Sequence, residues 1–200
     1  MRILLIGAQG KLGQKLINEL INYNNLTITK FAGNASDFEQ LKAQAIGHDV
    51  LVSTVSARSI EELVKIANNM IKIAAENNQR IVWSGGAGSL WTWDRTRLVD
   101  IPIDQFPTNL ESWKPAIYGH YEVLKLLQNS SITWSYMSPA LEFEDIEPLG
   151  WYQTKISDDA LYNEINIIFA SYASGAKALA AEITKPQYLN QRFTIYEICH

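Results

Sequence analysis

The chain begins with a short apolar segment that runs directly into a glycine-rich turn. Residues 2–6 read Arg-Ile-Leu-Leu-Ile, residues 7–13 read Gly-Ala-Gln-Gly-Lys-Leu-Gly, and apolar residues then recur at helical spacing as far as Ile21. A continuous apolar run is typical of a buried parallel strand. Glycines between such a strand and a helix let backbone N–H groups approach a phosphate at the positive end of the helix. The order of strand, glycines and helix therefore predicts a phosphate-binding turn.

The ligand expected at this turn is a dinucleotide, NAD(H) or NADP(H). The glycines have the spacing G-x-x-G-x-x-G, whereas the more common dinucleotide fingerprint is G-x-G-x-x-G. The alternative is that they only end a strand, fill a tight turn and let the helix pack closely on the sheet. Strand, glycines and helix each have a separate physical reason, and their coincidence favours the cofactor. The predicted contacts are Gly7, Gln9, Gly10, Lys11, Leu12 and Gly13.

Composition limits the class of protein. The 200 residues are 47% hydrophobic and contain no Pro/Gly-rich linker, so we expect one α/β domain over residues 1–200. A net charge of -4 disfavours a nucleic-acid partner, which normally selects for a basic surface. The chain has no apolar run of about 18 residues, and its first strand is too short for a signal peptide. We therefore expect a cytoplasmic protein with no membrane partner.

Cysteine and histidine usage argues against disulfide and metal chemistry. Cys199 is the only cysteine, so the chain cannot form an internal disulfide. His48, His120 and His200 are widely separated and have no cysteine cluster near them. We therefore expect a reducing compartment and no bound metal.

Apolar runs and helical patterns alternate along the chain. We predict strands at 3–6, 26–31, 50–55, 80–83, 132–137 and 193–196, and helices at 12–21, 38–45, 60–75, 117–127 and 171–183. Ser36 or Asp37 is placed to cap the second helix, and Ser59 with Glu62 forms a capping box before the third. This alternation predicts a doubly wound, mostly parallel sheet. Residues 85–115 form a long, aromatic, irregular segment, and such loops are usually functional.

Ligands of open α/β sheets bind beyond the carboxyl ends of the strands. Small or hydroxylated residues follow three of the predicted strands, in segments 53–58, 84–89 and 138–140. Such residues allow a cofactor to approach the backbone closely. The predicted cofactor contacts from these segments are Ser53, Ser56, Ser84 and Pro139.

Four segments carry a resemblance to a known group of proteins. They are IGAQGKLG at 6–13, SGGAGSL at 84–90, TWSYMSPA at 133–140 and KPQYLNQRFT at 185–194. Over nearly its whole length the chain resembles the atypical short-chain dehydrogenase/reductase group, which includes NmrA-like proteins and bacterial NADH-flavin reductases. The resemblance implies a Rossmann fold, NAD(H) or NADP(H) as cofactor, and a flavin or quinone as substrate.

The chain departs from this group after the first helix. Relatives have two strands there, whereas here only residues 26–31 precede the next helix, so one strand is expected to be shortened or missing. Where a dehydrogenase places an acid for NAD or an arginine for NADP, this chain offers Lys30, with Asn34 and Asp37 further on. The choice between the two cofactors is therefore left open.

Tyr121 and Lys125 reproduce the Y-x-x-x-K pattern of short-chain dehydrogenases. Residues four apart share a helix face, so Lys125 is placed to hold the nicotinamide ribose and to make Tyr121 a proton donor, while Ser84 orients the substrate oxygen. Alternatively, Tyr121 packs in the core and Lys125 is solvated. In the resembling biliverdin and flavin reductases a histidine lies in this part of the helix, which makes His120 a candidate substrate contact. The alternative, and the more common case for a lone helix histidine, is a surface residue.

The irregular segment contains aromatic residues where such folds place the substrate. Aromatic surfaces accept flat rings such as isoalloxazines and quinones, so we predict that Trp91 and Trp93 contact a small molecule with a planar ring. Alternatively, these tryptophans pin the loop to the core or form the contact of a homodimer.

Three functions are compatible with these residues. The first is an NAD(P)H-dependent oxidoreductase that transfers hydride to a flat acceptor, with the chemistry supplied by the cofactor. The second is a dinucleotide-sensing regulatory protein without turnover, as among NmrA-like proteins. The third is a degenerate Rossmann domain that binds no dinucleotide and serves as an interaction module. The glycine turn favours the reductase.

Overall fold

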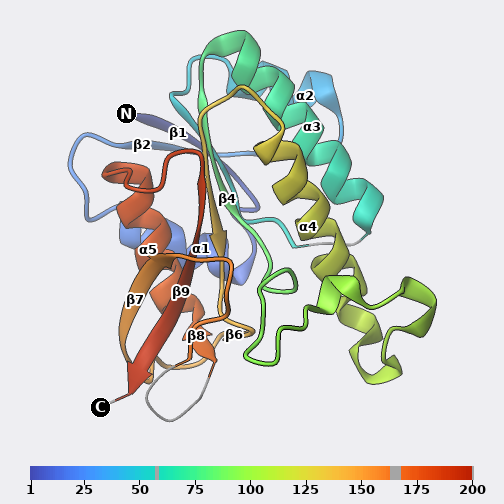
Figure 1. Cartoon of the computed structure of the whole chain (residues 1–200). Coiled ribbons are helices and arrows are strands. Elements are labelled where there is room, and N and C mark those ends of the chain that lie inside the picture. The colour runs from blue at the N-terminus through green and yellow to red at the C-terminus, as the bar shows by residue number, and fades with distance from the viewer. Residues whose placement is uncertain (57–58, 163–167, 200) are drawn as a thin grey trace.

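The computed structural model describes residues 1–56, 59–162 and 168–199 and centres on a seven-stranded sheet (Figure 1). The strand order is β2-β1-β3-β4-β5-β9-β7. The parallel strands are β1 (Arg2–Ile6), β2 (Thr27–Lys30), β3 (Val50–Ser53), β4 (Arg80–Ser84), β5 (Trp134–Ser138) and β9 (Gln191–Cys199). At one edge, β7 (Gly150–Ile156) pairs antiparallel with β9, and β6 (Glu142–Glu144) with β8 (Phe169–Ser171) forms a small separate sheet.

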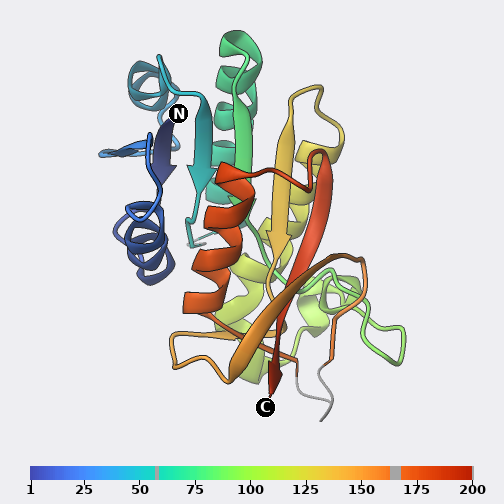
Figure 2. The ribbon, with the colours of Figure 1, turned by 90° about the vertical axis from the view of Figure 1, so that its left-hand side faces the viewer.

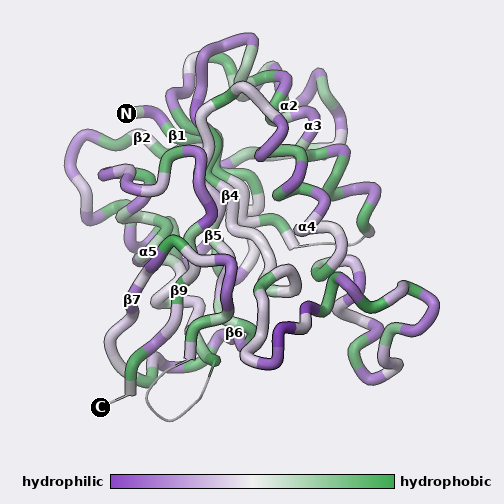
Figure 3. Tube along the Cα trace, viewed as in Figure 1, coloured by the Kyte–Doolittle hydropathy of each residue, from purple (hydrophilic) through white to green (hydrophobic). Residues whose placement is uncertain are grey.

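Helices cover both faces of the sheet, as a doubly wound fold requires (Figures 1 and 2). One face carries α1 (Lys11–Leu20) and α5 (Tyr172–Thr184), and the other carries α2 (Phe38–Ala45), α3 (Ile60–Asn77) and α4 (Lys114–Gln128). Hydrophobic and hydrophilic residues alternate along α3 and α4, as expected for helices that bury one face (Figure 3). In the described part of the chain, no helix is long and apolar enough to cross a membrane.

The positions of the predicted strands and helices are confirmed, and the fold is Rossmann-like, with a mostly parallel main sheet. The strands β6, β7 and β8 were not predicted. The segment 85–115 is irregular as expected, with 3₁₀ turns at Leu98–Asp100, Ile103–Gln105 and Thr108–Trp113. Ser59 caps α3, because its Oγ accepts a hydrogen bond from Glu62 N at 3.0 Å.

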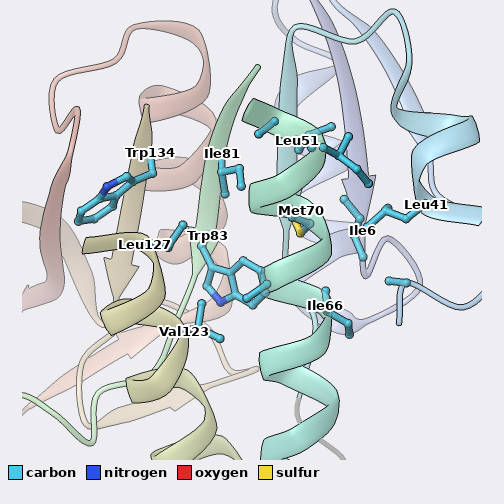
Figure 4. Packing of buried hydrophobic residues seen from close by; sticks show 14 of the residues in the cluster. Ile6, Leu41, Leu51, Ile66, Met70, Ile81, Trp83, Val123, Leu127 and Trp134 are labelled. Atoms are coloured by element: carbon cyan, nitrogen blue, oxygen red, sulfur yellow. The ribbon is translucent and has the colours of Figure 1, made fainter. Parts of the chain in front are cut away.

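Each face of the sheet has its own hydrophobic core. On the α3/α4 face, the fully buried Trp83 of β4 lies between Ile66 and Met70 of α3 and Val123 and Leu127 of α4 (Figure 4). Burying a side chain of this size contributes about 2 to 3 kcal/mol. Trp83 therefore joins the central strand to both helices.

The predicted loss of a strand after the first helix is confirmed, since β2 is the edge strand and α2 follows it directly. Side chains of α2 hold the segment that an outer strand would otherwise support. Gln44 exchanges two hydrogen bonds with the backbone of Ala32, at 3.1 and 2.7 Å, and Gln40 Oε1 accepts from Asn34 N at 3.1 Å. Of the two predicted caps of α2, Asp37 is the one that accepts from Gln40 N.

Glu197, a fully buried carboxylate on β9, fixes the start of α5. It accepts hydrogen bonds from Leu149 N at 2.6 Å, Ser171 N at 2.9 Å and Ser171 Oγ at 2.6 Å, and Ser171 Oγ in turn accepts from Ser174 N. Burial alone would raise the pKa of Glu197, but these hydrogen bonds outweigh burial and hold the pKa below its usual value.

Replacing Glu197→Gln is expected to lower the free energy of unfolding at neutral pH by about 1 to 3 kcal/mol, because an NH₂ group cannot accept these hydrogen bonds. The pKa of Glu197 is lower in the folded protein than in the unfolded chain. Its contribution to the free energy of unfolding is therefore complete above the unfolded pKa and is lost as pH falls through the folded pKa. Urea unfolding at neutral pH and at about pH 3 measures the difference in free energy of unfolding between the wild type and Glu197→Gln, which should be smaller in acid. The exposed Glu147→Gln is the control, and equal stability of the two variants at neutral pH would contradict this role.

Candidate functional site

Two cavities meet at the carboxyl ends of β1 and β3, where the strand order reverses. The first, of about 450 Å³, lies between the glycine turn, the segment after β2 and the start of α3. The second, of about 280 Å³, lies between the glycine turn, the end of β4 and α4. Both are lined by Gly10, Thr54, Val55 and Ser56. They are therefore two halves of one groove, at the place where α/β sheets bind ligands.

Gly7 and Gly13 are required by the packing of the backbone. Gly7 has a φ of +87°, and a Cβ there would lie 2.7 Å from the carbonyl carbon of Thr54. A Cβ on Gly13 would lie 2.3 Å from the carbonyl oxygen of Gly7. The Thr54 hydroxyl donates to the carbonyl oxygens of Ile6 and Gly7, at 3.3 and 3.2 Å. For Gly7 and Gly13, close packing is therefore a sufficient reason to be glycine.

Gly10 differs, because no contact within the described part of the chain requires glycine there. It is the N-cap of α1, its φ of -70° suits any residue, and its Cβ would have Gly7 O at 3.4 Å as its nearest neighbour. Serine or aspartate is preferred at an N-cap, yet Gly10 makes no side-chain cap and the first turn of α1 has no acidic residue. The bare helix start faces both cavities, which is the arrangement that binds a phosphate.

The other predicted residues of the turn are divided between the two cavities. Gln9 lines the first, whereas Lys11 and Leu12 line the second. Lys15 and Lys11 form ion pairs with Asp145 at 3.0 and 3.4 Å, and these lysines, Lys15 first, lower the pKa of the Asp145 carboxyl. The start of α1 therefore carries positive charge.

His120 is buried in α4 and lines the second cavity, so the expectation of a surface histidine is wrong. Its Nδ1 accepts a hydrogen bond from Trp83 Nε1–H at 3.2 Å. The proton of the neutral ring is therefore on Nε2, which has no hydrogen-bond partner in residues 1–56, 59–162 and 168–199. Burial lowers the pKa of His120 to about 4, so the ring is neutral at physiological pH.

The wall opposite His120 is aromatic. Phe143 and Tyr172 line the second cavity with ring centroids 4.6 Å apart, and the Tyr172 hydroxyl has no partner in the described parts of the chain. Ser84 and Gly85 form the floor at the end of β4. A hydrogen bond from Gly86 N to the Tyr136 hydroxyl, at 3.1 Å, holds this loop in place. The second cavity thus offers flat faces and unpaired donors.

Several predicted substrate and catalytic residues lie outside both cavities. Tyr121 and Lys125 are neighbours on α4, with the ammonium 4.9 Å from the ring centroid, but Lys125 pairs with Glu122 at 2.7 Å and neither residue lines the groove. Trp91 exchanges backbone hydrogen bonds with the segment 158–160, and Trp93 is 81% exposed. The irregular segment therefore turns its tryptophans away from the groove, and their predicted roles stay predictions.

Two of the predicted cofactor contacts are enclosed by the protein. Ser53 and Pro139 are buried and line neither cavity, whereas the predicted Ser56 and Ser84 do line the groove. Residues 57–58, at the end of the segment predicted to follow β3, lie outside the described residues, as does His200. Among the lining residues that the sequence analysis did not name as contacts are Phe31, Thr54, Glu62, Phe143 and Tyr172. Only Thr54 had a signal, as the residue next to the predicted Ser53.

The comparisons with known proteins agree with this geometry. The uncharacterized protein YwnB of Bacillus subtilis strain 168 is 31% identical over 215 residues, covering 98% of each chain. A structure named "putative NADH-flavin reductase", from Streptococcus pneumoniae TIGR4, is 28% identical, with a TM-score of 0.81 over 98% of this chain and 99% of that one. The chain belongs to the atypical short-chain dehydrogenase/reductase group.

Solved structures with lower sequence identity to this chain share its fold. ChuY, an anaerobilin reductase from Escherichia coli O157:H7, is 15% identical and has a TM-score of 0.74, over 98% of this chain and 97% of that one. No protein-family model matches the chain. As a short-chain dehydrogenase relative it has a groove suited to a nicotinamide dinucleotide, and the glycine turn lies in that groove.

The buried His120 is expected to make stability depend on pH. Its pKa is about 4 in the folded protein and about 6.5 when unfolded, so between these values the unfolded chain binds more protons. The free energy of unfolding should therefore rise with pH across this window, by about 1 to 3 kcal/mol. Unfolding curves of the wild type and His120→Gln measure this, and the variant should lack that part of the rise. An NMR titration of the His120 ring with a midpoint near the unfolded value would contradict the prediction.

Proposed function

We propose that the protein is an NAD(P)H-dependent reductase that transfers hydride to a flat acceptor such as a flavin or a quinone. The observation that carries the proposal is Gly10, a helix start kept bare between two cavities although the fold has room for a side chain. A dinucleotide has two nucleoside halves joined by a pyrophosphate, which matches two cavities joined at a phosphate-binding turn. The structural relative named as an NADH-flavin reductase, 28% identical to this chain, supports the same class of reaction.

Each half of the groove suits one half of the cofactor. Gly10 N donates to Gly7 O, so the N–H groups of the first turn of α1 bind the pyrophosphate. Lys11 and Lys15, which share Asp145, add positive charge nearby. The adenosine half occupies the first cavity, beside the segment after β2, and the nicotinamide half lies beside Ser84 in the second. Reduced nicotinamide supplies the hydride.

The second cavity supports a role for His120 in holding the acceptor. Its neutral ring presents Nε2–H as a hydrogen-bond donor, and a neutral imidazole polarises a substrate oxygen or nitrogen without carrying a positive charge. Phe143 and Tyr172 supply the flat surfaces against which a planar ring stacks. In this proposal His120 replaces Tyr121 as the donor to the substrate, because His120 lines the groove.

The first test is cofactor binding by wild type and Gly10→Ser. Titration with NADH and NADPH, followed by tryptophan quenching, should show saturable binding by the wild type. The serine side chain fits the protein and can cap α1, so stability should be unchanged or slightly higher. Binding should fall by about tenfold or more, because the added atoms occupy the phosphate position.

The matched control is Gly13→Ala, which should lose about 1 to 3 kcal/mol of stability through the clash with Gly7 O. Unchanged binding by a stable Gly10→Ser variant would show that this turn holds no cofactor. Failure of the wild type to bind either nucleotide would favour the interaction module. Binding without turnover of flavins, quinones or carbonyl compounds would favour a dinucleotide sensor.

A second prediction concerns the donor to the substrate. His120→Phe removes Nε2–H and should lower kcat/KM for a flavin or quinone by about tenfold or more at saturating cofactor. His120→Gln should restore part of the loss, because one amide can accept from Trp83 and donate into the cavity. Tyr121→Phe tests the alternative donor. A loss of rate in Tyr121→Phe, with no loss in His120→Phe, would show that Tyr121 and not His120 is the donor to the substrate.

A further inference from the structure

We propose that the first cavity selects NADH over NADPH, and that Glu62 is the residue responsible. This inference rests on the proposed function, that the groove binds a reduced nicotinamide dinucleotide. The two cofactors differ only in a phosphate on the 2′-hydroxyl of the adenosine ribose, which adds about -1.5 to -2 units of charge. The choice between them is therefore made by the charges and donors of the cavity that receives the adenosine half.

Among the residues that the structure describes, Glu62 is the only ionisable one in the lining of the first cavity. Its carboxylate has no hydrogen bond or ion pair to any residue in the described ranges, so it remains available to a ligand. Asp37, the acid noted in the sequence, is unavailable by contrast, since Gln40 N and Nε2 donate to its two oxygens at 3.1 and 2.9 Å. A free carboxylate accepts hydrogen bonds from ribose hydroxyls and repels a phosphate.

Several backbone N–H groups in and beside this cavity are also used within the protein. Along the segment after β2, Ala32 N donates to Gln44, Asn34 N donates to Gln40, and Ser36 N donates to Asn34 Oδ1 at 2.9 Å. At the start of α3, Glu62 N donates to Ser59 Oγ. A 2′-phosphate needs several N–H groups or a guanidinium for its oxygens, and these amides are not free to supply them.

Two lysines belong to the adjoining elements but not to the lining. Lys30 ends β2, and its side chain is exposed. Hydrogen bonds from Gln40 lower the pKa of Asp37, and the nearby Lys65 of α3 lowers it further. Neither lysine therefore provides a cation inside the cavity. The lysine in the position expected for NADP thus points to solvent, whereas the acid in the cavity comes from α3.

The experiment compares dissociation constants of NADH and NADPH for wild type, Glu62→Gln and Glu61→Gln. Glu61 is the matched control, because it is the neighbouring acid of α3, is exposed and lies outside the lining. The wild type should bind NADH about tenfold or more tighter than NADPH. Glu62→Gln should narrow this ratio to about threefold or less, with most of the change in NADPH, and Glu61→Gln should leave the ratio unchanged.

Competition by adenosine fragments gives a readout independent of the nicotinamide half. Adenosine 5′-monophosphate should displace NADH from the wild type, and adenosine 2′,5′-bisphosphate should do so only weakly. Glu62→Gln should strengthen competition by the bisphosphate. Melting temperatures of the three proteins establish that each variant is folded.

The outcomes separate this inference from the proposed function. Binding of neither nucleotide by wild type would overturn both. Equal or tighter binding of NADPH would overturn the inference alone, and loss of that binding in Lys30→Ala would assign the choice to the lysine. A wild-type preference for NADH that persists unchanged in Glu62→Gln would overturn the role of Glu62.

Discussion

The position of the groove depends on a backbone contact that leaves no space for a Cβ atom. Gly13 of α1 packs on the carbonyl of Gly7, and Gly7 packs on the backbone of Thr54. These contacts bring the start of α1 to the ends of β1 and β3 and hold it there. The structural and the binding interpretation of the motif therefore apply to different glycines: Gly7 and Gly13 serve packing, and Gly10 is left bare toward the ligand.

The substrate half of the groove is built from buried polar groups. Trp83 fills the core between two helices and also donates to His120 Nδ1, which leaves Nε2–H as the remaining imidazole donor of a residue that lines the second cavity. The Tyr136 hydroxyl donates to His120 O at 2.9 Å and accepts from Gly86 N, so one side chain positions both α4 and the loop after β4. Burial lowers the pKa of His120 and keeps its imidazole neutral. His120 is therefore an uncharged hydrogen-bond donor in the lining of the second cavity.

The segment after β2, which has no outer strand beside it, is supported by a helix. Gln40 and Gln44 of α2 hydrogen-bond to the backbone of Asn34 and Ala32 and hold this segment at the edge of the first cavity. Asp37 is used as a helix cap. Among the described residues, Glu62 is the only ionisable one in the lining of the first cavity. The acidic group of this cavity therefore belongs to helix α3 and not to the edge of the sheet.

Local patterns were sufficient to predict most of the fold and part of the site. Apolar periodicity located the strands and helices, and the glycine spacing located the turn, because both depend on residues close in sequence. The strand β7 was missed because its side chains, such as Trp151 and Tyr152, do not alternate clearly between apolar and polar. Within the site, sequence neighbours lie differently. Thr54 lines the groove and Ser53 does not, and His120, also predicted as a substrate contact, lines the groove whereas Tyr121 does not. One residue reverses the face of a strand and turns a helix by about 100°. The rotation of α4 is set by packing against β4 and α3, which are distant in sequence. The sequence by itself therefore determined where the elements and the glycine turn lie. Only the tertiary structure decided which of two neighbouring side chains lines the groove.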